Sequence, residues 1–255
     1  MKRRTTKIFA LLFTVVLIFG AMPFSAFADF KIDPKIQVQH KNGGSDSYQT
    51  LLNAVNSAKD GDVISIAGEV TSYSTTENIN ITKNITLKTG ENFSGSAKYL
   101  QYNGTSAPLF TVKNGATLTI KDSLIYGNTN AESIYGGLIR VENGGKLIID
   151  GKTSISGCKL TAADSKGGVV YVANGGKVTV NAGTFKNNSA TTGNDICAEN
   201  KDDVTVKSGV TVSVDYYEGS MPNHCPYCGK VHSDDFFGQI VKIFHMILNF
   251  FNNLF

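Results

Sequence analysis

Two cysteines and two histidines near the C-terminus are the residues of this chain best suited to chemistry. Cys225 and Cys228 are separated by two residues, a glycine follows the second, and His224 and His232 flank the pair. A Cys-x-x-Cys turn aims two thiolates at one tetrahedral ion, and His232 with His224 would complete a zinc site. An isolated pair also fits a local disulfide in an oxidising exterior, free thiols, or a thiol redox site. Segment 224–235 is therefore a candidate zinc knuckle, with these alternatives open.

Carboxylates are the other candidates for catalysis, because glycoside hydrolysis needs two carboxyl groups at a defined separation. Acids are scattered singly through the middle of the chain, where Asp202 and Asp203 form the only adjacent pair. A solenoid would bring Glu142 onto one face with Asp122 or Asp150, but no motif selects these residues. We expect solvated surface positions and predict no catalytic set.

Side chains that could contact a sugar directly are few. The chain has no tryptophan, and Tyr126, Tyr135 and Tyr171 are the candidates for stacking, although Tyr171 adjoins an apolar position and is expected to pack in the core.

The other two cysteines, Cys158 and Cys197, are interpreted as small core residues and not as a disulfide.

The first 28 residues have the three parts of a secretory signal peptide. Four basic residues precede an apolar run from Ile8 to Phe19, and Ala26-Phe27-Ala28 is a small-residue cleavage site. We predict cleavage after Ala28 and a secreted or cell-surface location. Removing four basic residues and no acid lowers the formal net charge from +3 to −1, so the mature chain gives no electrostatic reason to propose nucleic acid as a partner.

The start of the mature chain is predicted to lead into a short helix. Residues 29–44 are polar and form a leader strand or linker. Next, Ser45-Asp46-Ser47 offers N-cap side chains, and the apolar spacing that follows predicts a helix over about 47–59, stopped by Gly61. The β-branched run Val63-Ile64-Ser65-Ile66 comes directly after it.

One repeated pattern decides the predicted fold. Val112 to Ile120 recurs as Val141 to Ile149 and as Val172 to Val180, and each copy contains Asn-Gly. The Asn residues of these copies are 29 and 31 residues apart, and Asn200 of a degraded copy follows 26 residues later. Weaker copies lie around Ile81–Leu87 and Val204–Val206. A unit this short cannot bury its apolar face alone, whereas stacked coils can. Residues 45–214 are thus predicted to form a parallel β-helix, in an all-β protein; a β-sandwich is the structural alternative.

The repeats carry a family resemblance. Asp46 to Ile66 resembles the capping helix and first strand of the pectin-lyase-like, right-handed, single-stranded parallel β-helix superfamily. The Asn-Gly-Gly copies and the Asn187-Asn188-Ser189-Ala190 ending are similar to adhesin-like repeats of bacterial surface proteins. The resemblance implies a β-helix over about 45–214. It also implies polyuronide cleavage by Ca²⁺-bound carboxylates or an aspartate trio, but the family's Asn-Thr-Asp, Asp-Asp and Gly-His-Gly series is absent.

Composition changes after Val214. Residues 215–223 form a linker to the cysteine segment, and 236–255 form an amphipathic helix whose polar arc holds one lysine. Its apolar arc would lie at a membrane interface, dock onto a partner, or close the open end of the β-helix. The whole tail resembles C-terminal tails of secreted proteins of Gram-positive gut-type bacteria.

These observations predict a secreted or cell-surface, non-enzymatic, adhesin-like protein. It would bind a glycan or a protein through the solenoid face and associate with a surface or partner through its tail. The alternatives are a polysaccharide lyase or glycoside hydrolase, and a thiol redox protein acting through Cys225 and Cys228. A glycan and host-protein binding array on the mature chain is the most informative experiment, because the architecture is better determined than the binding target.

Overall fold

The computed structural model describes residues 35–66, 71–90 and 95–217. The predicted signal peptide at 1–28, the cysteine segment at 224–235 and the amphipathic helix at 236–255 lie outside the described residues. Within the described part of the chain, no helix is long and apolar enough to cross a membrane.

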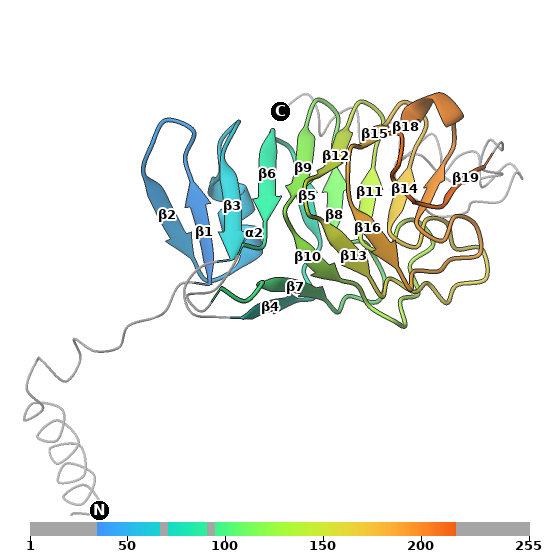
Figure 1. Ribbon diagram of the computed structural model, residues 1–255, viewed down its shortest axis with the longest axis horizontal. Helices are drawn as coiled ribbons and strands as arrows, with labels where there is room; N and C mark the ends of the chain where they lie inside the picture. The colour runs from blue at the N-terminus through green and yellow to red at the C-terminus, as the bar shows by residue number, and fades with distance from the viewer. Residues whose placement is uncertain (1–34, 67–70, 91–94, 218–255) are drawn as a thin grey trace, which may run out of the picture.

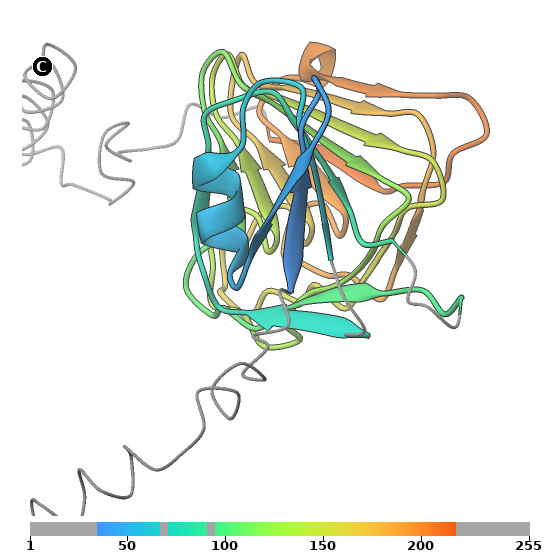
Figure 2. The ribbon, with the colours of Figure 1, turned by 90° about the vertical axis from the view of Figure 1, so that its left-hand side faces the viewer.

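The described strands wind into a parallel β-solenoid of about five coils with three sheets, here called A, B and C (Figures 1 and 2). Sheet A has the spatial order β18 (Val204–Val206), β15 (Lys177–Val180), β12 (Lys146–Asp150), β9 (Thr117–Lys121), β6 (Ile85–Lys88), β3 (Val63–Ile66), β1 (Ile36–Gln39), β2 (Ser45–Tyr48). Sheet B has the order β16 (Thr184–Lys186), β13 (Ser154–Ser156), β10 (Leu124–Tyr126), β7 (Tyr99–Tyr102), β4 (Ser72–Thr75). Sheet C has the order β19 (Val214–Tyr216), β17 (Ile196–Ala198), β14 (Val170–Val172), β11 (Ile139–Val141), β8 (Phe110–Val112), β5 (Ile79–Ile81).

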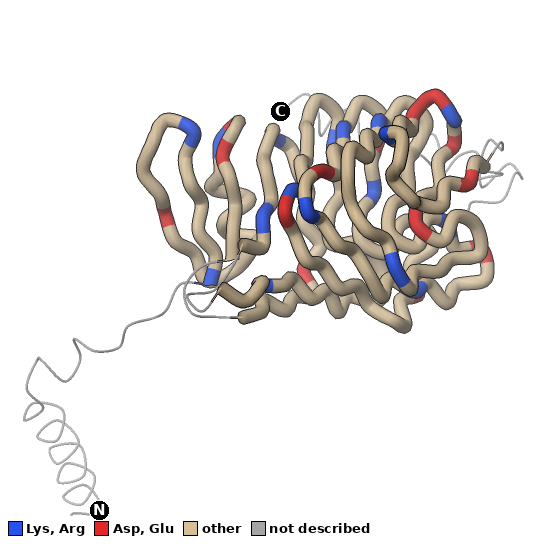
Figure 3. Tube along the Cα trace, viewed as in Figure 1, with Lys and Arg blue, Asp and Glu red and all other residues tan. Residues whose placement is uncertain are grey.

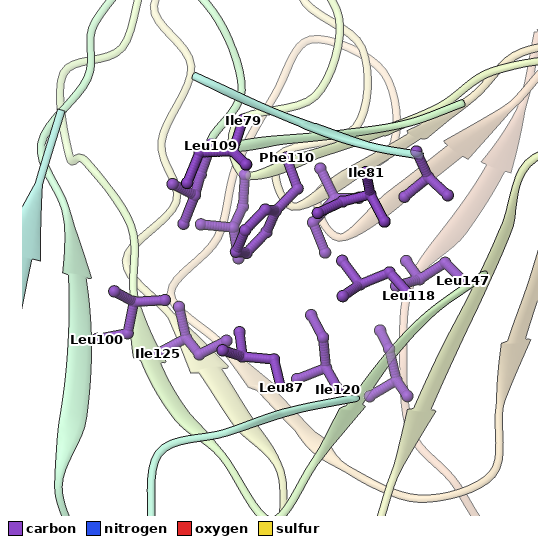
Figure 4. Packing of buried hydrophobic residues seen from close by; sticks show 14 of the residues in the cluster. Ile79, Ile81, Leu87, Leu100, Leu109, Phe110, Leu118, Ile120, Ile125 and Leu147 are labelled. Carbon is purple, nitrogen blue, oxygen red and sulfur yellow. The ribbon is translucent and has the colours of Figure 1, made fainter. Parts of the chain in front are cut away.

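The register of sheet A confirms the predicted repeats. Leu147 of β12 pairs with Leu118 of β9 on one side and with Val178 of β15 on the other. The same column continues to Val204 of β18. Residues of these columns alternate with outward neighbours, and Figure 4 shows aliphatic side chains from all three sheets pointing toward one another in the interior. The predicted parallel solenoid is confirmed and the sandwich alternative is excluded.

The Asn-Gly corners stack as the repeats predicted. The N–H of Gly115 donates to the carbonyl of Gly144, whose own N–H donates to the carbonyl of Gly175. At Gly144 φ is 73°, and a Cβ there would lie 2.0 Å from Oδ1 of Asn114. Only glycine satisfies both the left-handed backbone and the close approach of the next coil.

The N-terminal end differs from the prediction in its boundaries. The helix α2 spans Leu51–Ser57 and begins after Thr50, whose hydroxyl accepts the N–H of Asn53. The expected cap, Ser45-Asp46-Ser47, is instead part of β2, which pairs antiparallel with β1. The start predicted at 47 was therefore wrong, because the β1 pairing satisfies the backbone of these residues. β1 itself lies within the predicted leader and pairs antiparallel with β3.

The helix covers apolar surface at this end of the solenoid. Leu51, Ala54 and Val55 are buried, and the helix contacts β1, β2 and β5 (Figure 2). The first coil is correspondingly well covered: its inward side chains Ile64, Ile79 and Ile81 are 0 to 1% exposed. A short 3₁₀ helix, η2 (Lys201–Asp203), precedes the last strand of sheet A at the opposite end.

Candidate functional site

The thiols of the described region are structural. Cys158 and Cys197 are buried and unpaired, as predicted. Burial raises the pKa of Cys158 to about 12 and that of Cys197 to about 11. Because the thiolate is the reactive form, neither residue is a nucleophile at neutral pH.

The predicted zinc knuckle stays a prediction, because its ligands Cys225, Cys228, His224 and His232 lie outside the described residues. Among the described residues, no group of three or more His, Cys, Asp or Glu is placed to hold a metal ion.

Two of the three candidate carboxylates share one corner of the solenoid. Asp122 follows β9 and Asp150 ends β12 on the adjacent coil, where the chain leaves sheet A and turns toward sheet B. Oδ1 of Asp122 accepts the N–H of Lys152 at 3.0 Å, and its Oδ2 lies 4.0 Å from Nζ of Lys88. Asp150 lies 3.8 Å from Nζ of Lys121. Asp122 thus links adjacent coils through a backbone hydrogen bond.

Glu142 lies at the other end of the sheet A strands. It precedes β12, whereas Asp150 ends it, and a five-residue strand covers about 13 Å between its first and last Cα atoms. Glycosidase carboxyl groups are separated by about 5 to 9.5 Å. Glu142 is also engaged, 3.0 Å from Lys113 and 4.0 Å from Arg140. The arrangement does not bring Glu142 together with the other two acids.

Two of the predicted stacking aromatics form a covered cluster on the outer face of sheet C. Tyr171 is 0% exposed and Tyr135 8%, and their ring centroids are 4.8 Å apart. The guanidinium of Arg140 lies 5.4 Å and 5.7 Å from the two ring centroids, and Nζ of Lys166 lies 4.5 Å from that of Tyr217. Cations over ring faces stabilise such a cluster when it is shielded from water.

Hydrogen bonding locks the same cluster in place. The Tyr171 hydroxyl donates to Oε1 of Glu199, and Oε2 of Glu199 accepts the N–H of Asn174 at 2.8 Å. Burial, followed by the Glu199 carboxylate, raises the pKa of Tyr171. Tyr135 and Tyr171 therefore hold loops of successive coils against sheet C, and they are closed to a sugar.

The third aromatic, Tyr126, stays partly exposed on the outer face of sheet B. Its ring meets that of Tyr99 edge to face, with centroids 5.3 Å apart. Tyr99 lies beside Leu124 in the sheet register, and Leu124 is two residues before Tyr126 on the same face. These three side chains form a small apolar patch next to the corner that holds Asp122.

A cavity of about 600 Å³ opens at that corner, between the end of sheet A and the start of sheet B. Its volume falls within the range of about 300 to 1,000 Å³ that is usual for small-ligand sites. The lining combines two ammonium groups, one carboxylate, hydroxyl groups and aliphatic surface: Lys88, Thr89, Gly90, Ala97, Asp122, Ser123, Leu124, Lys152. This cavity and the Tyr99–Tyr126 pair are the candidate site, called here the corner site.

Sequence reasoning missed most of the corner site. Lys88 ends β6 and Lys152 follows β12, so two coils separate them in the chain and only stacking brings both to one cavity. The available signal was position in the repeat, since Lys88, Lys121 and Asp150 occupy one row at the end of sheet A.

Charges on the rest of the surface are mixed. The face seen in Figure 3 carries acidic and basic residues side by side, with no large region of one sign.

His40 forms a hydrogen-bonded cluster with two aspartates at the N-terminal end of the solenoid. The ring of His40 contacts Oδ2 of Asp62 at 2.8 Å through Nδ1 and Oδ2 of Asp46 at 3.0 Å through Nε2. The hydrogen bonds to Asp62 and then to Asp46 raise the pKa of His40. Burial alone would raise the pKa of Asp62, but hydrogen bonds from the N–H of Lys59, from His40 and from the N–H of Lys41 outweigh it and lower that pKa.

The fold places this chain in the class of parallel β-solenoid proteins. In comparisons with known proteins, no protein-family model, no curated protein and no solved structure matches the chain.

Proposed function

We propose that this protein is a secreted or cell-surface, non-enzymatic binding protein whose solenoid presents a rigid recognition surface for a glycan or a surface protein. Residues 224–255 associate it with a surface or a partner, in the manner of an adhesin. The right-handed, pectin-lyase-like form of the solenoid belongs to the same proposal. It is supported by three sheets whose successive coils pair in parallel and by the Asn-Gly corners that stack between sheets C and A.

The observation that carries this proposal is the chemistry of the corner site. The ammonium groups of Lys88 and Lys152 are hydrogen-bond donors and the Asp122 carboxylate is an acceptor, so a hydroxyl-rich or anionic ligand finds partners there. The Tyr99–Tyr126 patch adds an aromatic surface beside the cavity. Tyr99, Tyr126 and Lys88 lie on strands of stacked coils, and the turn residues Asp122 and Lys152 are joined by a hydrogen bond between coils. Such a preorganised surface loses little conformational entropy on binding.

A glycan and host-protein binding array on the mature chain, residues 29–255, tests this function. Lys152→Glu inverts one charge of the corner site, and Lys186→Glu makes the same change at an exposed position on β16. We expect Lys152→Glu to weaken binding at least tenfold and Lys186→Glu to leave it unchanged, with both variants folded by circular dichroism. Equal binding by both variants, or no bound species on the array, would contradict the proposal.

An enzymatic function is the second candidate, because Asp122 and Asp150 come to the same corner on adjacent coils. Uronate-containing and neutral glycans would be screened for product release with and without Ca²⁺. Asp122→Asn and Asp150→Asn are the informative variants, since asparagine keeps the acceptor oxygen that Lys152 uses. Turnover that either variant abolishes would replace binding by polysaccharide cleavage.

The thiol redox alternative concerns only the C-terminal cysteines. Native mass spectrometry of the mature chain distinguishes a bound zinc ion from a mass deficit of two hydrogens at Cys225 and Cys228. Zinc would argue against redox work, because coordinated thiolates are structural ligands in closed sites. A disulfide that glutathione reduces readily would favour the redox reading.

A further inference from the structure

The two ends of the solenoid are unlike. At the N-terminal end, α2 and the β1–β2 pair cover the first coil, whose inward residues are nearly inaccessible. At the C-terminal end, among the described residues, β18, β16 and β19 each have a strand neighbour on one side only. Their outer backbone groups form an open edge in all three sheets, and natural proteins cover such edges to prevent strand addition by other chains.

The inward side chains of the last coil show the same difference. Val180 and Val178 are 0% and 1% exposed, whereas Val206 and Val204, which continue their columns, are only partly buried. In the other two sheets Phe185 follows Ile155, and Val214 follows Ile196, with the same loss of burial. Partly buried apolar residues thus gather at this end: Phe185, Val204, Val206, Val210, Val212, Val214. We call this set the open end.

We infer that the C-terminal segment 236–255 of the same chain packs its apolar arc on the open end and closes the solenoid. The described chain ends at Tyr217, one residue after the edge strand β19, and therefore at the surface that the segment would cover. Eighteen residues, 218–235, separate the two, and an extended chain of that length spans up to about 60 Å.

The apolar character of the open end matches that of one arc of segment 236–255. The open end is aliphatic and aromatic, and the sequence of 236–255 places phenylalanine, isoleucine, leucine and valine on one helical arc. The opposite arc carries glutamine, asparagine, histidine and a single lysine, which suits a surface facing water. One lysine gives little attraction to anionic lipid, so the segment is better matched to a protein surface than to a membrane. A solenoid needs such a terminal cap with a polar outer face. This inference does not depend on the corner site. It assigns residues 236–255 to the solenoid itself and leaves association with a surface or partner to residues 224–235.

Hydrogen exchange on the mature chain tests the inference, with residues 29–255 compared against a chain ending at 235. We expect deletion of the segment to speed amide exchange at least tenfold in β18 and β19 and to leave β1 and β3 unchanged. The shortened chain should also self-associate as its concentration rises, because its edges are open. Unchanged exchange in β18 and β19 together with a monomeric shortened chain would overturn the inference.

Point variants in the full chain keep the test decisive if the shortened chain does not fold. Phe244→Asp places a charge on the apolar arc, and Asn249→Asp places the same charge on the polar arc. On the solenoid, Val206→Asp and Thr205→Asp are the corresponding pair on one strand, facing inward and outward. Phe244→Asp and Val206→Asp should each reproduce the faster exchange of β18 and β19. The double variant should exchange at about the same rate as either single variant. The two control variants should exchange like the unaltered chain.

The rival occupants give different results. If the full chain binds vesicles of phosphatidylcholine and phosphatidylglycerol, and Phe244→Asp abolishes that binding without altering exchange in β18 and β19, the segment serves a membrane and the inference fails. If protection of β18 and β19 appears only at concentrations where sedimentation shows a dimer, a second copy covers the open end and the inference fails as well.

Discussion

The most direct test of the interior is the exchange of Leu147 for alanine. Leu147 is 1% exposed and lies in the column between Leu118 and Val178. Losing three buried carbons costs about 2.4 kcal/mol at about 0.8 kcal/mol for each, and the cavity left behind adds to that cost. Parallel strands hold β12 on both sides, so the cavity cannot collapse easily. We therefore expect a loss of about 3 to 4 kcal/mol in the free energy of unfolding.

The adjacent residue supplies the control. Ile148 faces outward from the same strand, in a row with Thr119 and Thr179, so Ile148→Thr should change stability by less than about 0.5 kcal/mol. Urea unfolding followed by circular dichroism measures both variants, with an unchanged denaturant slope as the condition for comparing midpoints. In thermal unfolding, Leu147→Ala should lower the Tm by about 6 to 16 °C. Equal losses in the two variants would refute the inward and outward assignment on which the whole solenoid rests.

Three further predictions concern other parts of the molecule. The stabilising effect of His40 should be fully present below its unfolded-state pKa of about 6.5 and should be lost as pH rises through its elevated folded-state pKa, so His40→Gln should flatten urea midpoints measured between pH 5 and 9. In a chain lacking the two C-terminal cysteines, Cys158 and Cys197 should react with a thiol reagent only on unfolding, as a time course with and without urea shows. Gly168→Ala should destabilise the fold by about 1 to 3 kcal/mol in urea unfolding, because its Cβ would lie 2.1 Å from the carbonyl oxygen of Asn194.

Repeats made the body of the fold predictable. Copies of Val-x-Asn-Gly followed by alternating aliphatic residues indicated both the coil and its register, and Leu118, Leu147 and Val178 do lie in one column. Short-range signals were less reliable. Ser45-Asp46-Ser47 has the side chains of a helix cap, yet it forms β2, because pairing with a strand outside the repeat outweighed local preference.

The corner site shows where sequence reasoning stops. Asp122 was selected from the sequence as a carboxylate, but its contact with the backbone of Lys152 and its place in a cavity wall depend on how coils stack. Tyr171 is buried as expected from its apolar neighbour, but Tyr135, a candidate for sugar stacking, is covered as well and lies with it against Arg140. Loop lengths vary between coils, and no periodic pattern specifies how such loops fold over a sheet.

The sequence by itself determined the parallel solenoid, its glycine corners and its inward columns, because each of these follows from a local pattern repeated at a regular interval. Tertiary structure alone decided which polar side chains from different coils meet, which aromatics are covered, and that, among the described residues, the inward side chains of the first coil are more deeply buried than those of the last. The physical reason is that burial in a solenoid depends on the coil above and the coil below. A repeat specifies the residues of its own coil and says nothing about which neighbour is missing.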